Sequence, residues 1–225
     1  MSQNLPSPIP KRLNVGCGFD IRPGYLNVDF VDFHKPDLVA NVTDLPMLPS
    51  GYFDEVVAQD VWEHFERSKT LPALTEWARL LSPVGTLRIR VPSFYHLVDM
   101  MMNAEEADAA RVKDVLHLIY GTQAYPGDYH LTGFTPVVTN DFFAAAGLVV
   151  NEVRLRDGWL FEIAASHGGV SVAEWPLARV QRSGDQVGVL QQEIDRLRAD
   201  VKALHQSTSW KITAPLRRLK ERIRS

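Results

Sequence analysis

The feature that most constrains the fold is a series of short apolar runs that alternate with helical patterns through the first half of the chain. This alternation is typical of βαβ units. Five runs are expected strands, at residues 11–16, 25–30, 37–42, 53–59 and 85–91. The pattern therefore predicts an α/β fold on a parallel sheet, with little room for a helix in the first crossover.

Helical spacing continues between and after these strands. The fourth strand is expected to lead into a helix that ends near Leu81, and residues 82–85 (SPVG) predict a turn. Residues 94–119 carry a helical pattern, and residues 120–134 form a polar loop. Thr139 or Asn140 is the expected N-cap of a short helix that ends at Gly147.

Two further apolar runs flank an Asp-Gly pair, which is a hairpin signal. They cover residues 148–155 and 159–165. We therefore expect five parallel strands followed by an antiparallel hairpin.

The division expected from the sequence is a domain at residues 1–166, a linker at 167–184, and a coiled-coil helix with a basic tail at 185–225. The helix carries an apolar stripe at heptad spacing, which consists of Val187, Leu190, Ile194, Leu197, Val201 and Leu204. Pairing with another chain and docking on its own domain both fit a stripe this short.

Charge and composition exclude several protein classes. The net charge is −3, although residues 207–225 hold six Lys or Arg and one Glu, so the body of the chain is acidic and nucleic acid is not an expected partner. No run approaches the roughly 18 apolar residues of a membrane-spanning helix. A single cysteine, Cys17, allows no internal disulfide and favours a cytoplasmic location.

The first predicted strand ends in a glycine loop, Leu13-Asn14-Val15-Gly16-Cys17-Gly18. Such a loop exposes backbone N–H groups and lets a ligand approach the main chain. A dinucleotide fingerprint needs a third glycine where this chain has Ile21, which disfavours nicotinamide cofactors. A tight turn without a ligand is the alternative.

Acidic residues follow the second and third predicted strands. Asp29 ends the second strand, and Asp44 follows the third. Open α/β sheets bind ligands at the carboxyl ends of their strands. A carboxylate at Asp29 suits ribose hydroxyls, and one at Asp44 suits an adenine amino group.

Four segments together resemble class I S-adenosylmethionine-dependent methyltransferases. They are KRLNVGCG, GYLNVDF, NVTDLPMLPSGYFDEVVAQDVWEHF and LTEWARLLSPVGTLRIRVPSF, and the resemblance covers residues 11–165. The most similar branch is that of small bacterial enzymes associated with surface-polysaccharide (lipopolysaccharide O-antigen or capsule) biosynthesis. The resemblance implies a Rossmann-like sheet of parallel strands with an antiparallel C-terminal hairpin.

The resemblance also implies S-adenosylmethionine as cofactor and assigns roles along the chain. The loop of Gly16, Cys17 and Gly18 would pass beneath the methionine part, and Asp29 would hold the ribose. The other expected contacts are Asp44 and Leu45 at the adenine and Gln59 near the sulfonium. Asn14 stands where many such enzymes carry an acid, so the methionine amino group is held differently here.

A sugar hydroxyl needs a base or a metal to attack a methyl group. His64, after the fourth strand, and His130, in the polar loop, are the candidate bases. The alternatives are a helix-start residue bonded to backbone for His64 and a bridge to Asp128 for His130. We expect no metal site, since the sequence shows no acidic cluster and no close pair of histidines. If a metal did bind, Asp60, Glu63 and Asp128 could supply oxygen ligands.

A saccharide or nucleotide sugar is the expected acceptor. Aromatic rings suit the C–H faces of sugars, and the candidates are Trp62, Phe94, Tyr95, Tyr125 and Tyr129. Residues 207–217 (STSWKITAPLR) are similar to segments that follow coiled coils in bacterial polysaccharide glycosyltransferases. This similarity points to a sugar acceptor, and the heptads at 187–204 predict a homo-oligomer or a glycosyltransferase partner.

The basic tail fits three environments. It can lie on an anionic surface such as the inner membrane, form a solvated helix end, or dock on the acidic body of another chain. Two other functions also stay open: a scaffold for glycan assembly that transfers no methyl group, and methylation of nitrogen or of a small metabolite. Methylation of nitrogen would be favoured by an Asn/Asp-Pro-Pro-Tyr/Phe motif after the fourth strand, and this chain has Gln59-Asp60-Val61-Trp62 at that position.

Overall fold

The computed structural model describes residues 5–102, 109–124, 127–169, 171, 173–178, 188, 191–199 and 202–203. It divides into two compact units, Met1–Ala178 and Arg179–Ser225. Several positions of interest lie outside the described residues, namely Tyr125, the heptad residues Val187, Leu190, Val201 and Leu204, and the tail at 207–225.

All named strands and helices belong to the first unit. The strands are β1 (Arg12–Val15), β2 (Leu26–Asp29), β3 (Leu38–Val39), β4 (Phe53–Gln59), β5 (Leu81–Pro92), β6 (Leu148–Arg156) and β7 (Leu160–His167). The helices are α1 (Arg67–Leu80), α2 (Phe94–Met102), α3 (Ala109–Tyr120) and α4 (Pro136–Ala145). Two 3₁₀ turns, η1 (Asp32–His34) and η2 (Trp62–His64), lie between them.

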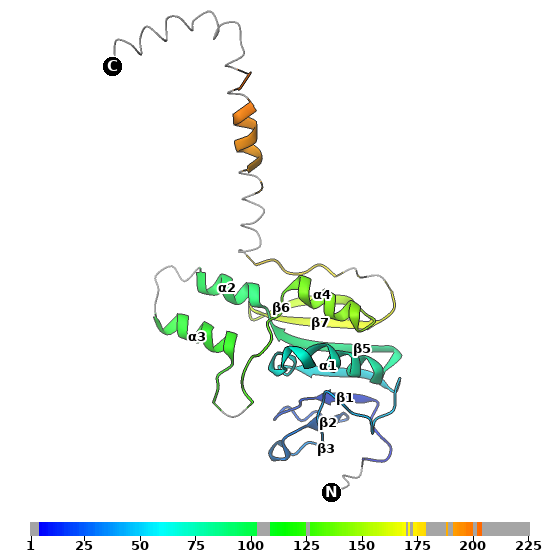
Figure 1. Cartoon of the computed structure of the whole chain (residues 1–225). Coiled ribbons are helices and arrows are strands. Elements are labelled where there is room, and N and C mark those ends of the chain that lie inside the picture. Colours follow the sequence, from blue (N-terminus) through cyan, green and yellow to red (C-terminus); the bar gives the residue numbers. More distant parts are fainter. Residues whose placement is uncertain are drawn as a thin grey trace, which may run out of the picture. The chain divides into compact units, whose positions relative to one another are not determined.

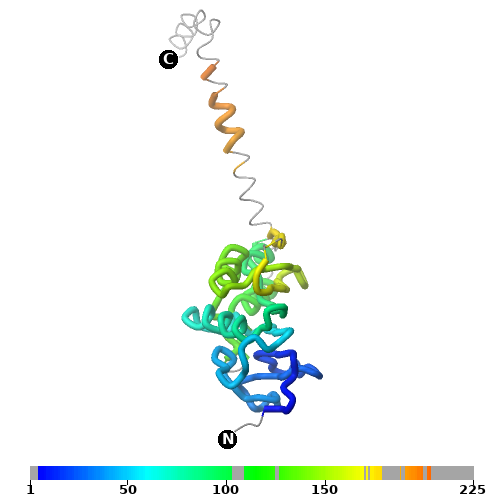
Figure 2. Tube along the Cα trace, turned by 90° about the vertical axis from the view of Figure 1, so that its right-hand side faces the viewer, coloured from blue at the N-terminus to red at the C-terminus, as the bar shows by residue number. Residues whose placement is uncertain are grey.

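The strands form one mixed sheet in the order β3-β2-β1-β4-β5-β7-β6. Strands β1 to β5 run parallel, and β7 is antiparallel to both β5 and β6. The N-terminal strands and the C-terminal hairpin therefore lie at opposite ends of this unit (Figures 1 and 2). The predicted Rossmann-like sheet with its antiparallel hairpin is confirmed.

Helices α1 and α4 cover one face of the sheet (Figure 1). Alternate strand residues such as Val56 and Leu87 point to this face and are fully buried. They form one core with Leu74 and Trp77 of α1 and Phe143 of α4. Burial of these large apolar side chains stabilises the fold and fixes the strand register, because a shift by one residue would expose them.

The opposite face carries polar and charged side chains. Glu55 of β4 accepts hydrogen bonds from the Tyr25 hydroxyl and from Arg88 Nε. Arg90 of β5 pairs with Asp60 just beyond the end of β4, with Nε 2.9 Å from Oδ1. These contacts tie β4 to β5 across the surface of the sheet.

The sequence predictions for residues 82–85 and for the cap of α4 are wrong. Residues 82–85 belong to the first part of β5 and do not form a turn. Gly85 allows the backbone of β4 to pass close by, since a Cβ on Gly85 would lie 2.7 Å from the Phe53 carbonyl oxygen. The cap of α4 is Thr135 rather than Thr139 or Asn140, since its side chain accepts from the Val138 N–H and Pro136 begins the helix.

Short connections follow strands β1 and β4 at their carboxyl ends. Residues 16–25 between β1 and β2 contain no helix, as expected from the sequence. After β4 the chain first makes η2 and enters α1 only at Arg67, whereas the sequence predicted that the strand runs directly into a helix. This leaves the segment after β4 free to carry site residues.

In the second unit, residues 191–199 are helical. Ile194 and Leu197, the two heptad positions among the described residues, are 43% and 51% exposed. Coiled-coil pairing stays a prediction. Among the residues that the structure describes, no helix is long and apolar enough to span a membrane.

Candidate active site

The glycine loop after β1 has a backbone that favours glycine. Gly16 and Gly18 have φ values of 62° and 49°, and the Asp20 N–H closes the turn onto the Cys17 carbonyl. A Cβ at Gly16 would lie 2.3 Å from Val61 Cγ2, whereas a Cβ at Gly18 would meet nothing within 4 Å. Gly16 thus packs the loop against the segment after β4, and Gly18 borders open space. Burial raises the pKa of Cys17 to about 12, which keeps the thiol protonated.

Asp29 ends β2 and is only 4% exposed. Its Oδ2 accepts from the Gly18 N–H at 2.8 Å, and its Oδ1 accepts from the Val31 N–H at 2.9 Å. His34 Nδ1 lies 3.2 Å from Oδ1. The N–H bonds hold the carboxylate in one orientation and leave it lone pairs for the two hydroxyls of a ribose.

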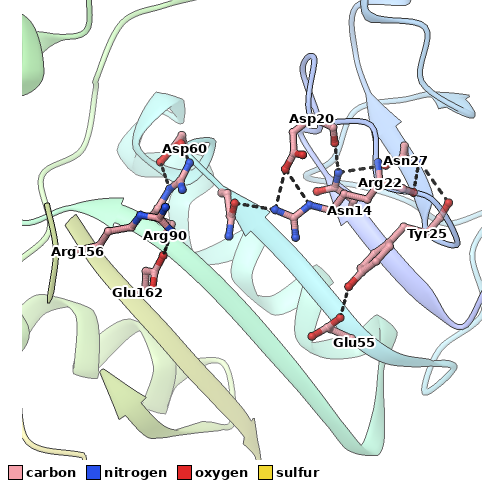
Figure 3. Close-up of polar contacts among 11 residues, drawn as sticks. Asn14, Asp20, Arg22, Tyr25, Asn27, Glu55, Asp60, Arg90, Arg156 and Glu162 are labelled. Carbon is pink, nitrogen blue, oxygen red and sulfur yellow. Dashed lines mark hydrogen bonds and ion pairs between the residues drawn. The ribbon is translucent and has the colours of Figure 1, made fainter. Parts of the chain in front are cut away.

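Sequence reasoning missed Arg22, which lies in the loop between β1 and β2. Its guanidinium donates to Asp20 Oδ2 through Nε at 2.8 Å and to Gln59 Oε1 through Nη2 at 2.7 Å. Figure 3 shows Arg22 beside Asp20, with Asn14 of β1 and Asn27 of β2 next to this loop. Asn14 Nδ2 donates to the Asp20 carbonyl at 2.7 Å and to Asn27 Oδ1 at 3.1 Å, so Asn14 supports the loop rather than facing outward.

The predicted adenine-side residues have different environments. Asp44 is exposed, whereas the Leu45 side chain is fully buried in the core. The Leu45 N–H donates to Glu76 Oε1 at 2.8 Å, and Glu76 also binds Arg79. Helix α1 thereby fixes the backbone that follows β3.

The structure brings the two predicted histidines together. The ring centroids of His64 and His130 are 4.9 Å apart. His64 Nδ1 lies 3.1 Å from the Tyr129 carbonyl oxygen, and His130 Nδ1 lies 3.0 Å from the Leu118 carbonyl oxygen. A carbonyl only accepts, so each neutral ring carries its proton on Nδ1 and has a lone pair on Nε2. Burial, and secondly the His64 ring, lower the pKa of His130, which favours its neutral form.

Backbone bonds and ring stacking hold this pair in place. The Glu63 carbonyl accepts from the N–H groups of Leu131 and Thr132, at 2.8 and 3.2 Å. Trp62 stacks on Phe134 with ring centroids 4.4 Å apart. The loop that carries His130 is thus attached to η2, a contact between distant segments that no sequence pattern signals.

The acidic residues near the pair differ in their partners. Asp60 pairs with Arg90 (Figure 3), and Asp128 Oδ2 accepts from the Thr122 hydroxyl, so the proposed bridge from His130 to Asp128 is not formed. Glu63 is 2% exposed, and its Oε2 has no hydrogen-bond partner in the part of the chain that the structure describes. Burial raises the pKa of Glu63 to about 8.

The aromatic candidates for acceptor contact separate into two groups. Trp62 is fully buried and donates its Nε1–H to the Thr70 carbonyl, so the expectation that it faces an acceptor is wrong. Phe94 and Tyr129 are 40% and 44% exposed. Tyr129 precedes His130 in the chain, and its backbone carbonyl contacts His64.

Comparisons with known proteins agree with this fold. Residues 8–89 match the family model described as "Methyltransferase domain". No curated protein matches the chain. The solved PH0226 protein of Pyrococcus horikoshii is similar in fold, with a TM-score of 0.50, 13% identity, and coverage of 72% of this chain and 84% of that one.

Two further solved structures are more distant. A SAM-dependent methyltransferase from Archaeoglobus fulgidus has a TM-score of 0.47 and 13% identity, and the match covers 70% of this chain and 86% of that chain. The 1,6-didemethyltoxoflavin-N1-methyltransferase of Burkholderia thailandensis, solved with S-adenosylhomocysteine, has a TM-score of 0.46 and 14% identity, with coverage of 70% and 71%.

Proposed function

We propose that this chain, a methyltransferase whose cofactor is S-adenosylmethionine, methylates a hydroxyl oxygen of a saccharide. The single observation that carries the choice of oxygen is the histidine pair. His64 and His130 present two Nε2 lone pairs at one place, beyond the end of β4. A hydroxyl needs such a base near neutral pH, whereas an amine is already nucleophilic in its neutral form.

The residues at the carboxyl edge fit the cofactor. Gly18 borders open space, and Asp29 offers two oriented acceptor oxygens for the ribose. We assign Asp44 and Leu45 to the adenine side of the cofactor, where Leu45 supports the backbone next to Asp44. We assign Gln59 to the sulfonium end of the cofactor. When bound, S-adenosylmethionine supplies an electrophilic methyl group on a sulfonium.

Arg22 adds a charge to this edge that the resemblance alone did not assign. It lies between the glycine loop and Gln59, and its side chain is 24% exposed. A guanidinium pairs well with a carboxylate. We assign Arg22 to the carboxylate of the methionine part, with Asn14 and Asn27 holding the loop that carries it.

The histidines act on the acceptor. The Nδ1–H bonds to backbone carbonyls fix both rings, so one Nε2 can take the hydroxyl proton while its partner ring stays neutral. Exposed rings at Phe94 and Tyr129 offer flat apolar surfaces that suit the C–H faces of a sugar. We assign the acceptor to surface-polysaccharide precursors, with the heptad helix as the contact to a second copy or a glycosyltransferase.

Transfer of a labelled methyl group tests this proposal. The purified full chain is incubated with methyl-labelled cofactor and a panel of nucleotide sugars, oligosaccharides, amines and N-heterocycles. We expect label on a saccharide oxygen, at least tenfold slower transfer in His64→Ala and His130→Ala, and unchanged transfer in His117→Ala, an exposed control on α3. Label only on nitrogen acceptors, or equal rates in all three variants, would contradict the proposal.

A further inference from the structure

We propose that Glu63, His64 and His130 form a binding site for one divalent transition-metal ion of the Zn²⁺ type. One potential ligand atom from each residue lies within 4.8 Å of the other two. Two imidazoles and one carboxylate are a ligand set that zinc and its first-row neighbours use in proteins. Three observations support this assignment.

The first observation is the buried carboxylate of Glu63. Its residue is 2% exposed, and Oε2 has no hydrogen-bond partner among the described residues. A buried carboxyl oxygen without a partner is costly, and a bound cation would supply the missing partner. Within the described residues, His64 and His130 each bind a backbone carbonyl and no acid, so the Glu63 carboxyl and the two imidazoles can share one ion.

The second observation is the orientation of the imidazoles. Each ring donates Nδ1–H to a backbone carbonyl, that of Tyr129 for His64 and that of Leu118 for His130. Metal-binding histidines in proteins carry this kind of outer hydrogen bond, which fixes the tautomer and directs the other nitrogen to the metal. Here the Nε2 atoms of both rings are the available ligands.

The third observation is the backbone that joins the two ligand segments. The Glu63 carbonyl binds the Leu131 and Thr132 N–H groups, and the His130 N–H binds the Tyr120 carbonyl. The ligands are thus attached to a framework that exists without an ion. Ligand atoms around a tetrahedral Zn²⁺ lie about 3.4 Å apart, so these atoms, which now lie within 4.8 Å of one another, would move closer together when an ion binds.

The neighbouring acids do not belong to this site. Asp60 is held by Arg90, and Asp128 by the Thr122 hydroxyl. The site therefore has one carboxylate and two nitrogen ligands, which excludes the all-oxygen coordination preferred by Mg²⁺ and Ca²⁺. It also leaves at least one coordination position open, as catalytic zinc sites do.

An ion at this position would act on the acceptor, and this consequence alone rests on the proposed function. A bound cation lowers the pKa of an oxygen that it contacts. The two histidines would then hold the ion, and the proton of the acceptor hydroxyl would pass to solvent water rather than to an imidazole. The binding site itself is independent of what the acceptor is.

Direct metal binding tests the inference. The untagged full chain is stripped with chelator and titrated with Zn²⁺ by calorimetry and with Co²⁺ by visible absorption. We expect one equivalent bound, a Co²⁺ spectrum of four or five ligands, and at least tenfold weaker binding in Glu63→Gln, His64→Ala and His130→Ala. The exposed control His117→Ala should bind as the unmodified chain does.

Stability provides a second readout for variants that fold poorly. Zn²⁺ should raise the Tm of the unmodified chain and of His117→Ala, and should leave the Tm of His130→Ala unchanged. Circular dichroism confirms that each variant is folded. Absence of binding, or equal binding in all variants, would overturn the metal site.

The same preparations separate this inference from the proposed function. Sugar methylation at an unchanged rate by stripped protein that binds no Zn²⁺ overturns the metal site and leaves the function standing. If the unmodified chain binds one equivalent of Zn²⁺ and the three variants do not, the metal site is supported even where no saccharide is methylated. In that case only the proposed function fails.

Discussion

The backbone N–H of Gly18 donates a 2.8 Å hydrogen bond to Oδ2 of Asp29, and this bond joins the loop after β1 to the last residue of β2. A second N–H, that of Val31, holds the other carboxylate oxygen. The two bonds orient a nearly buried charge before any ligand arrives. Oriented acceptors of this kind lose little entropy on binding, so they contribute strongly to affinity.

Asp29→Asn should weaken binding of S-adenosylmethionine at least tenfold, or about 1.4 kcal/mol. The amide would set an NH₂ group against one of the N–H donors from Gly18 and Val31, and it would lose the charge that attracts ribose hydroxyls. Calorimetry with S-adenosylhomocysteine measures the effect. Asp32→Asn removes an exposed acid from η1 and should leave the affinity unchanged; equal effects of both variants would refute the role of Asp29.

Gly16→Ala should destabilise the fold more than Gly24→Ala. Both glycines have positive φ, 62° and 78°, which costs an alanine about 1 kcal/mol. Only at Gly16 does the new Cβ meet Val61, at 2.3 Å, and such an overlap adds about 1–3 kcal/mol. Denaturant unfolding measures both variants.

A double variant isolates the steric part of the Gly16 effect. Adding Val61→Ala to Gly16→Ala removes the closest overlapping atom, Val61 Cγ2 at 2.3 Å, and leaves the Val61 Cβ at 2.7 Å. The double variant should be more stable than the sum of the two single changes, with a coupling of about 1 kcal/mol or more. Additive losses would show that the close packing of Gly16 on Val61 is not the cause.

Arg22→Gln should reduce affinity for S-adenosylhomocysteine about tenfold while leaving affinity for adenosine nearly unchanged. The reason is that only the first ligand carries an amino-acid carboxylate, the group that we assign to Arg22. Asp29→Asn should weaken the binding of both S-adenosylhomocysteine and adenosine. Arg67→Gln, on the exposed start of α1, is the charge-matched control; a parallel loss of adenosine affinity in Arg22→Gln would count against the assignment.

Glu76→Gln should lower the free energy of unfolding by about 1 kcal/mol at pH 7. The hydrogen bond with Arg79 holds the pKa of Glu76 below its usual range, so the carboxylate stabilises the folded state above the unfolded pKa. This contribution is lost as the pH falls through the folded pKa. The difference between the two proteins should therefore be largest above about pH 5 and shrink in acid.

Unfolding at several pH values checks this dependence. Glu66→Gln, an exposed acid before α1 whose side chain makes no capping bond, should show no comparable loss. A Glu76→Gln difference that stays constant from pH 7 to pH 3 would contradict the role of the ion pair.

Much of the sheet follows from the sequence because short apolar runs and turn residues are local signals. The fourth strand was predicted at residues 53–59, where β4 lies, and the Asp-Gly hairpin joins β6 to β7. The segment at 82–85 was misread because Pro and Gly usually mark turns, whereas Gly85 here serves close contact between strands. Such a contact depends on a neighbour distant in the chain.

The candidate site was predictable only in part for the same reason. Asp29 lies at a strand end, which the pattern reveals, and the ribose contact proposed for its carboxylate rests on that place. Arg22 was missed because its partner Gln59 comes from another strand. The meeting of His64 with His130, and the buried carboxylate of Glu63 beside them, depend on how the loop before α4 packs on η2.

The most direct test of the central claim is the heat of binding of S-adenosylmethionine to the purified full chain, with NAD and the Asp29→Ala variant measured in parallel. We predict a Kd on the order of 1–100 μM for S-adenosylmethionine, a loss of that binding in Asp29→Ala, and no heat with NAD. Absence of binding by the folded chain, or binding that Asp29→Ala leaves unchanged, would contradict the account of this edge as the cofactor site.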